Sequence, residues 1–264
     1  MVALSKRNRD RKNSRNAIAS KSLGPLYAAI AVVMVIAVAA GLYLTHATNS
    51  TTTLGTSFLT GTSTTTISNS AKSVILYVNQ GNAFVSRSNF SSLLSFAKSN
   101  QFNTIFFQVY RSGSLLFSQS DLQFLVTSAH VENLKIYFAL YFTSPSQQIP
   151  SSIYSLGEDG INLDMSTLSP SDQANLLSTL SQNYHSGRTS VTSLDFQTTL
   201  KPDQLILETY STADQQYIHP GIIASVEPLA IPNAQEYNSQ FQYALKNSDG
   251  VMVFDYYGLL KTGY

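Results

Sequence analysis

The stretch that decides the fold is Gly157-Glu158-Asp159-Gly160-Ile161-Asn162-Leu163-Asp164-Met165-Ser166. Two glycines enclose two acidic residues at its start, which is typical of a turn. Three apolar residues then alternate with Asn162 and Asp164, and this two-residue period is that of a β-strand. In a parallel β/α barrel, the chemistry lies at the carboxyl ends of the strands. The stretch therefore predicts a short buried strand that carries polar side chains toward a site.

The sequence from residue 73 to the end repeats this design. Short apolar runs alternate with segments whose apolar residues follow the helical period, which favours parallel strands joined by helical crossovers. We therefore predict a compact (β/α)8 barrel of the TIM type over residues 73–264. The expected strands are 74–78, 104–110, 135–142, 158–165, 190–195, 204–208, 221–226 and 250–255, and the expected helices are 89–100, 121–131, 171–184 and 234–246.

Two features leave a second fold open. The helices expected after the fifth and sixth strands are poorly marked, and only nine residues follow Asp255, too few for a final helix of normal length. An α/β chain that does not complete the barrel can form an open doubly wound sheet instead. The open sheet is the alternative prediction.

Residues 26–44 form an apolar run without a charged side chain. Nineteen residues in a helix span about 29 Å, which matches the thickness of a bilayer core. Residues 1–25 hold seven basic residues and one acidic residue, a bias that keeps such a tail in the cytoplasm. We predict a single-pass transmembrane helix at 26–44 that binds the lipid bilayer of the cell membrane, with the N-terminus inside and the C-terminal domain outside.

A cleaved signal peptide is the alternative for this run, although its apolar region is normally only about 7–15 residues long. Residues 45–72 are mostly Ser, Thr, Asn and Gly, a composition that favours a flexible linker. The predicted organisation is thus a basic tail (1–25), a membrane helix (26–44), a linker (45–72) and a barrel (73–264).

Charge narrows the possible partners. Outside the basic tail the chain holds nine basic and 14 acidic residues, a net charge of −5, which argues against nucleic acid as a partner. No cysteine is present, so an exported domain would be held together by its core without disulfides. No metal-ligand spacing, phosphate-binding loop or Ser-His-Asp arrangement stands out, and we predict no metal and no cofactor.

Several segments resemble known barrels. Residues 103–117 and 129–137 resemble the second and third strand regions of glycoside-hydrolase-like barrel proteins, and residues 205–210 resemble a strand end of polygalactosaminidase-type barrels. Asp159, Gly160, Asn162 and Asp164 match the fourth-strand signature of family-eighteen chitinases. The closing Glu of that signature, which is the family's general acid, falls on Ser166. The resemblance implies a glycoside-hydrolase-like fold, and the serine puts the family's own mechanism in doubt, because a hydroxyl does not donate a proton at neutral pH.

Carboxylates at predicted strand ends are the candidate catalytic groups. Glycoside hydrolysis uses two carboxyl groups that face each other. Asp164 and Glu208 are the first pair, as acid/base and as nucleophile or stabilising charge, and Glu227 is the next candidate. Caps and turn residues are the structural alternative for all three.

Polar and aromatic residues at the same strand ends are candidates for binding sugar hydroxyls and stacking on sugar rings. They are Gln108, Tyr110, Arg111, Asn162, Tyr210, Asp255 and Tyr256.

These features together predict a membrane-anchored, extracytoplasmic glycoside-hydrolase-like protein that acts on polysaccharide. One alternative is a catalytically degenerate barrel that binds glycans without cleaving them, favoured by Ser166 and by the absence of Trp, the side chain with the largest stacking surface. The other is an envelope structural protein, since residues 21–41 resemble the N-terminus of archaeal type IV pilin-like proteins. The alternation of strands and helices argues against the β-rich head that a pilin-like protein would carry.

Overall fold

The computed structural model describes residues 72–82, 84–231 and 233–263. All of them fall within one compact unit, Ser68–Tyr264. Among these described residues no helix is long and apolar enough to cross a bilayer. The predicted basic tail, membrane helix and linker lie outside the described residues, and they remain predictions.

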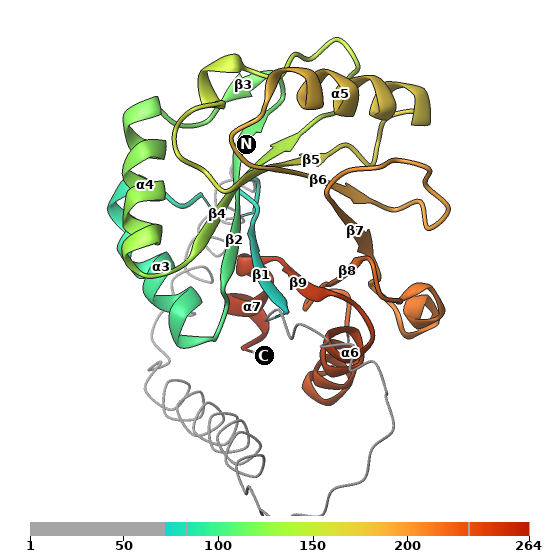
Figure 1. Cartoon of the computed structure of the whole chain (residues 1–264). Helices are drawn as coiled ribbons and strands as arrows, with labels where there is room; N and C mark the ends of the chain where they lie inside the picture. The colour runs from blue at the N-terminus through green and yellow to red at the C-terminus, as the bar shows by residue number, and fades with distance from the viewer. Residues whose placement is uncertain (1–71, 83, 232, 264) are drawn as a thin grey trace, which may run out of the picture. The chain divides into compact units, whose positions relative to one another are not determined.

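Eight parallel strands form a closed barrel (Figure 1). β1 pairs in parallel with β2 on one side and with β9 on the other, so the first and last strands of the barrel are neighbours. This closure confirms the barrel and excludes the open doubly wound sheet. The strands are β1 (Ser73–Val78), β2 (Thr104–Arg111), β4 (Lys135–Tyr141), β5 (Gly160–Asp164), β6 (Arg188–Ser193), β7 (Gln204–Glu208), β8 (Ile223–Val226) and β9 (Gly250–Phe254).

Five α-helices of the described residues accompany the strands, and four of them begin at a residue whose side chain caps them. Ser118, Ser169, Asn233 and Asp255 each accept a backbone N–H of the first turn with a side-chain oxygen, which satisfies one of the donors left free at a helix start. The helices are α3 (Phe90–Ser99), α4 (Gln119–Val131), α5 (Pro170–Asn183), α6 (Ala234–Asn247) and α7 (Tyr256–Thr262).

Three of the connections between barrel strands lack an α-helix. The β4–β5 and β7–β8 connections contain only the short 3-10 helices η2 (Ser151–Ile153) and η3 (Thr212–Tyr217), and residues 194–203 join β6 to β7 without a helix. The connections after the fifth and sixth barrel strands, where the sequence marked helices poorly, thus contain no α-helix. The last helix of the described residues, α7, has only seven residues, as the sequence indicated.

The strand period sorts the core into two parts. Inside the barrel, Tyr77, Phe106, Tyr137 and Met252 belong to one buried cluster, with the rings of Phe106 and Tyr137 stacked 4.7 Å apart. A β-carbon on Gly160 would overlap the Tyr137 ring, so this layer requires glycine at that place. The alternate strand residues face outward and form the larger cluster with the helices.

A β-bulge interrupts β2 just before its carboxyl end. Gln108 pairs with Ala139, and Tyr110 pairs with Leu140, so Val109 is an extra residue on this strand. Val109 and Tyr110 both belong to the outer cluster. The extra residue returns Arg111 to the inner side of the barrel, where Gln108 also lies. The hairpin strand β3 (Ser114–Leu115) then pairs antiparallel with the end of β2.

Candidate active site

A cavity of about 220 Å³ opens at the carboxyl ends of the barrel strands. The residues that line it come from β2, β4, β5, β7 and β9 or lie one or two residues after the end of a strand. They are Asn79, Gln108, Arg111, Tyr141, Asp164, Ser166, Glu208, Tyr210 and Phe254. A larger cavity of about 480 Å³ lies between the β4–β5 connection and α5, and Asp172 is the one acidic residue in its wall. The smaller cavity is the candidate site because it gathers two carboxyl groups at the strand ends.

Asp164 is the last residue of β5 and is 6% exposed. Its Oδ2 accepts a hydrogen bond from the hydroxyl of Tyr77 at 3.1 Å, and Tyr77 itself is fully buried in β1. Burial raises the pKa of Asp164 to about 6, while the Tyr77 hydrogen bond opposes this rise. Asp164 is thus a buried carboxyl group with a neutral partner, and it titrates close to neutrality.

Glu208 ends β7 and is half-buried in the wall of the same cavity. Burial raises the pKa of Glu208 to about 7, and the negative charges of Asp164 and Glu227 add to the rise. The nearby hydroxyl of Tyr210 opposes it. The negative charge of an ionised Asp164 favours the protonated form of Glu208. One of the two therefore tends to hold a proton near neutral pH.

Aromatic rings enclose this pair of carboxyl groups. The Phe254 ring lies 4.8 Å from the Tyr77 ring and 6.1 Å from the Tyr210 ring, centroid to centroid. Burial and the charge of Glu208 raise the pKa of Tyr210, so its hydroxyl stays protonated and can donate a hydrogen bond. The rings exclude water from one side of the carboxyl groups, which is consistent with the raised pKa values.

Gln108 and Arg111 form the part of the wall that β2 contributes. The Oε1 of Gln108 accepts the backbone N–H of Gln80 at 2.9 Å, which fixes the loop after β1 to β2. The guanidinium carbon of Arg111 lies 5.7 Å from the centre of the Tyr141 ring. Gln108, Arg111, Asp164, Glu208 and Tyr210 are thus the predicted site residues that the fold brings into one cavity.

The structure places the other predicted site residues elsewhere. Tyr110 packs outward with its ring 5.2 Å from that of Phe142. Asn162 lies below the cavity in the barrel interior, where its amide nitrogen donates to the hydroxyls of Ser190 and Thr192.

Three further predicted residues lie near the last two strands. Asp255 caps α7 and accepts a hydrogen bond from Asn82 at 2.7 Å. Tyr256 packs its ring edge-on against Phe96, 5.0 Å away. Glu227 follows β8 and is half-buried, and burial followed by the charge of Asp255 raises its pKa. Neither these three residues nor Tyr110 and Asn162 line the 220 Å³ cavity.

Sequence reasoning missed Asn79, Tyr141 and Phe254 in the cavity wall and Tyr77 beneath it. Asn79, Tyr141 and Phe254 each lie within one residue of the end of an expected strand, so the rule that selected Gln108 and Glu208 would also have found them. Tyr77 lies within a continuous apolar run, where it resembles a core residue.

The first acidic residue of the chitinase-like signature, Asp159, lies at the opposite end of β5. Its Oδ2 lies 2.9 Å from Nε2 of His130 in α4 and accepts the backbone N–H of Ile136 at 2.8 Å. Asp159 thus ties α4 and β4 to the start of β5. Ser166, by contrast, does line the cavity, at the position that the resemblance assigns to the general acid.

Among residues 72–82, 84–231 and 233–263, no group of three or more His, Cys, Asp or Glu side chains is placed to hold a metal ion.

Comparisons with known proteins bear on the fold. No family model matches the chain, and no curated protein matches it. Among solved structures, the barrel is similar to a chitinase from Bacteroides thetaiotaomicron, at 14% identity and a TM-score of 0.54, over 71% of this chain and 90% of that chain. A second similar structure is the family-eighteen chitinase ChiB of Flavobacterium johnsoniae, at 11% identity and a TM-score of 0.47, over 71% of this chain and 88% of that chain. A third is CpGH84B, at 9% identity and a TM-score of 0.48, over 69% of this chain and 44% of that chain.

At such low identity, the similarity to the first of these structures shows the fold. The chain from β1 to α7 is a (β/α)8 barrel, the fold that it shares with this chitinase. The particular reaction, if any, follows from the cavity and not from the fold.

Proposed function

We propose that this protein is a glycoside hydrolase that acts on polysaccharide through Asp164 and Glu208. The observation that carries the proposal is that both carboxyl groups line one small cavity at the strand ends, with pKa values raised to about 6 and about 7. Hydrolysis of a glycosidic bond needs one carboxyl group that holds a proton and one that is ionised. The different surroundings of the two residues separate these states near neutral pH.

The roles follow from the exposure of the two side chains. Glu208 has the more exposed side chain and a raised pKa, so it donates its proton to the leaving glycosidic oxygen. Asp164 is the carboxylate that stabilises the positive charge at the sugar carbon or takes a proton from the attacking water. Glu208 thus supplies the proton that a serine at position 166 cannot.

The test is hydrolysis of a panel of polysaccharides by the full-length protein. Asp164→Asn and Glu208→Gln should each reduce turnover by at least about 100-fold, since each removes one half of the acid/base pair. Glu158→Gln is a matched control, because Glu158 is also a buried carboxyl group with a raised pKa but lies at the amino end of β5. Turnover that survives both cavity substitutions would overturn the proposal.

The alternative is a barrel that binds glycans without cleaving them. Ser166 favours it, because a hydroxyl stands in the cavity where the chitinase-like signature has its acid. Glycan binding by the parent protein, without turnover on any member of the panel, would select this alternative.

We also propose that residues 26–44 anchor the protein in the cell membrane, with the barrel outside the cell. The apolar run and the basic residues before it support this placement. Protease added to intact cells should cleave the barrel domain, and the protein should sediment with the membrane fraction. Recovery in the cytosolic fraction would contradict the proposal.

A further inference from the structure

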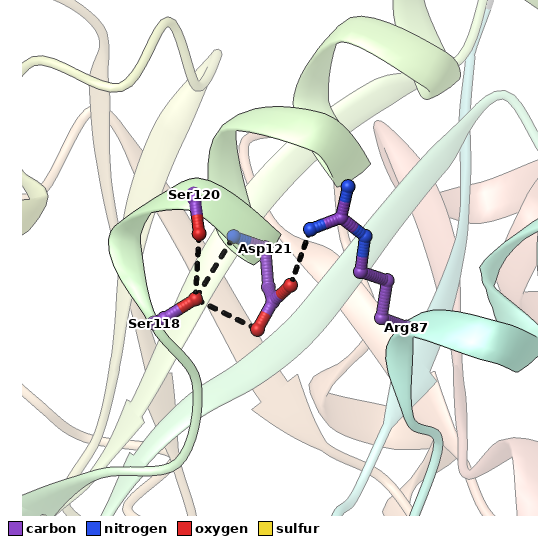
Figure 2. Close-up of polar contacts among 4 residues, drawn as sticks. All are labelled: Arg87, Ser118, Ser120 and Asp121. Carbon is purple, nitrogen blue, oxygen red and sulfur yellow. Dashed lines mark hydrogen bonds and ion pairs between the residues drawn. The ribbon is translucent and has the colours of Figure 1, made fainter.

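The arginine in the cavity wall is the feature that the proposed chemistry leaves unused. Three arginines lie in the described part of the chain, and they have different surroundings. Arg87 lies on the outer surface, 2.9 Å from Oδ1 of Asp121, whose other oxygen accepts the Ser118 hydroxyl (Figure 2). Arg188 is exposed to solvent at the start of β6. Arg111 is half-buried, and no carboxyl group among the described residues lies within ion-pair distance of it.

The position of Arg111 is built by its neighbours. The backbone of Gly81 lies directly against the Arg111 guanidinium, since a β-carbon at Gly81 would overlap it. The Tyr141 ring lies on another side at 5.7 Å, a distance at which a cation is attracted to a ring. A half-buried guanidinium loses hydration, and these two neutral neighbours replace only part of it.

The loop that holds Gly81 is itself fixed at several points. Asn79 accepts the backbone N–H of Gly81 at 2.8 Å, and Gln108 accepts that of Gln80 at 2.9 Å. The amide nitrogen of Asn82 donates to Asp255 at 2.7 Å, which joins the loop to the start of α7. The guanidinium therefore lies against a loop that is hydrogen-bonded to β2 and to the start of α7, and this arrangement orients it for a ligand.

The two carboxyl groups do not neutralise this arginine. A guanidinium lowers the pKa of a carboxyl group that lies beside it, whereas the pKa values of Asp164 and Glu208 are raised. Burial and the Tyr77 hydroxyl shift the pKa of Asp164. Burial, Asp164, Tyr210 and Glu227 shift the pKa of Glu208, and Arg111 is a cause in neither case. In the ring of strands, β2 and β7 are separated by three strands on either side, so Arg111 and Glu208 come from opposite sides of the barrel.

We propose that Arg111 selects a substrate whose sugar carries an anionic group, a uronic acid carboxylate or a sulfate ester. The proposal rests on the proposed function and adds the class of sugar. The anionic group lies on the Arg111 side of the cavity, while the glycosidic oxygen faces Glu208 on the opposite side. A guanidinium presents two parallel N–H donors to such a group, which gives direction as well as charge.

The test is calorimetric binding to the full-length protein carrying Glu208→Gln, so that no ligand is consumed. The two anionic ligands are an oligogalacturonate and a sulfated galactan oligosaccharide. The two neutral ligands are the methyl ester of the oligogalacturonate, which keeps the ring but removes the charge, and an N-acetylglucosamine oligomer. The oligogalacturonate or the sulfated oligomer should bind at least about 10-fold more tightly than the two neutral ligands, and whichever binds more tightly identifies the anionic group.

Substitutions assign the preference to this residue. Arg111→Gln should weaken binding of the preferred anionic ligand by about 10- to 100-fold and change binding of the neutral ligands little. Arg111→Lys should recover only part of this loss, because an ammonium lacks the paired donors. Gly81→Ala should reproduce the loss by displacing the guanidinium without removing it. Arg87→Gln is the matched control on the outer surface and should change nothing.

The outcomes separate this inference from the function on which it rests. Tighter binding of neutral ligands, or an anionic preference that survives Arg111→Gln, would overturn the role of Arg111 and leave hydrolysis by Asp164 and Glu208 standing. A parent protein that neither binds these ligands nor hydrolyses any polysaccharide of the panel would overturn both.

Discussion

The two ends of strand β5 carry acidic residues in opposite surroundings. At the amino end, Asp159 shares one oxygen between the imidazole of His130 and the backbone N–H of Ile136. At the carboxyl end, Asp164 is buried with only the neutral hydroxyl of Tyr77 as its hydrogen-bond donor, and its pKa rises to about 6. Five positions apart in one motif, the first carboxylate joins α4 and β4 to β5, whereas the second is buried with a raised pKa and is a candidate functional group.

The largest expected effect comes from removing the charge at the carboxyl end. The folded carboxyl group of Asp164 binds its proton more tightly than the unfolded one, whose pKa is near 3.8. Stability therefore falls as pH rises from about 4 to about 6, and above that window the ionised group costs roughly 3 kcal/mol. At pH 8 we expect the Asp164→Asn protein to unfold at a higher urea concentration than the parent, with a free energy of unfolding up to about 3 kcal/mol larger. At pH 4 the two free energies of unfolding should be equal.

Asp195→Asn, a change of the same kind on an exposed loop, gives the baseline for this measurement. An Asp164→Asn variant that is less stable than the parent at pH 8 would break the comparison, because Asp164 would then be a stabilising residue like Asp159.

A smaller change of opposite sign is expected at the amino end. Asp159→Ala leaves the backbone N–H of the buried Ile136 without its acceptor, which should lower the free energy of unfolding by about 1–3 kcal/mol. Asp159→Asn retains an oxygen for this N–H and should lose less. Urea unfolding measures both variants. Equal losses in the two would show that the charge, and not the acceptor, stabilises this end.

The smallest effect is expected at the hydrogen bond between Tyr77 and Asp164. This bond opposes the rise in the pKa of Asp164, so Tyr77→Phe should raise that pKa further, as a carbon-13 NMR titration of the Asp164 carboxyl group would measure. The lost hydrogen bond should cost about 1 kcal/mol of stability. A pKa that falls or stays the same would mean that the hydroxyl does not hold the ionised form of Asp164.

Much of the fold was readable from the sequence because it follows from local periodicity. Each strand and helix expected within residues 73–264 is present, with ends shifted by a few residues. The inward direction of Asn162 and Asp164 follows from the two-residue period. The gathering of Asp164 and Glu208 also followed, since parallel strands bring their carboxyl ends to one side of the barrel.

The sequence could not say which neighbours each strand end would meet. Asp159 and Asp164 both match the same chitinase-like motif, yet the strand places them at opposite ends of the barrel. Asp255 stands at a strand end like Glu208, but it is held by the N–H of Gly258 and by Asn82. Whether such a carboxylate caps a helix or faces a cavity depends on contacts with residues far away in the chain.

The clearest limit of the sequence is the end of β2. The sequence by itself determined that a strand ends in Gln108, Tyr110 and Arg111, and strict alternation would turn Arg111 away from the side that Gln108 faces. Only the tertiary structure shows that Val109 is the extra residue of a β-bulge. This bulge turns Tyr110 into the outer core and Arg111 into the cavity. A bulge is set by how β2 pairs with β4 and by how the outer core packs, and neither is encoded in the local pattern of β2 itself.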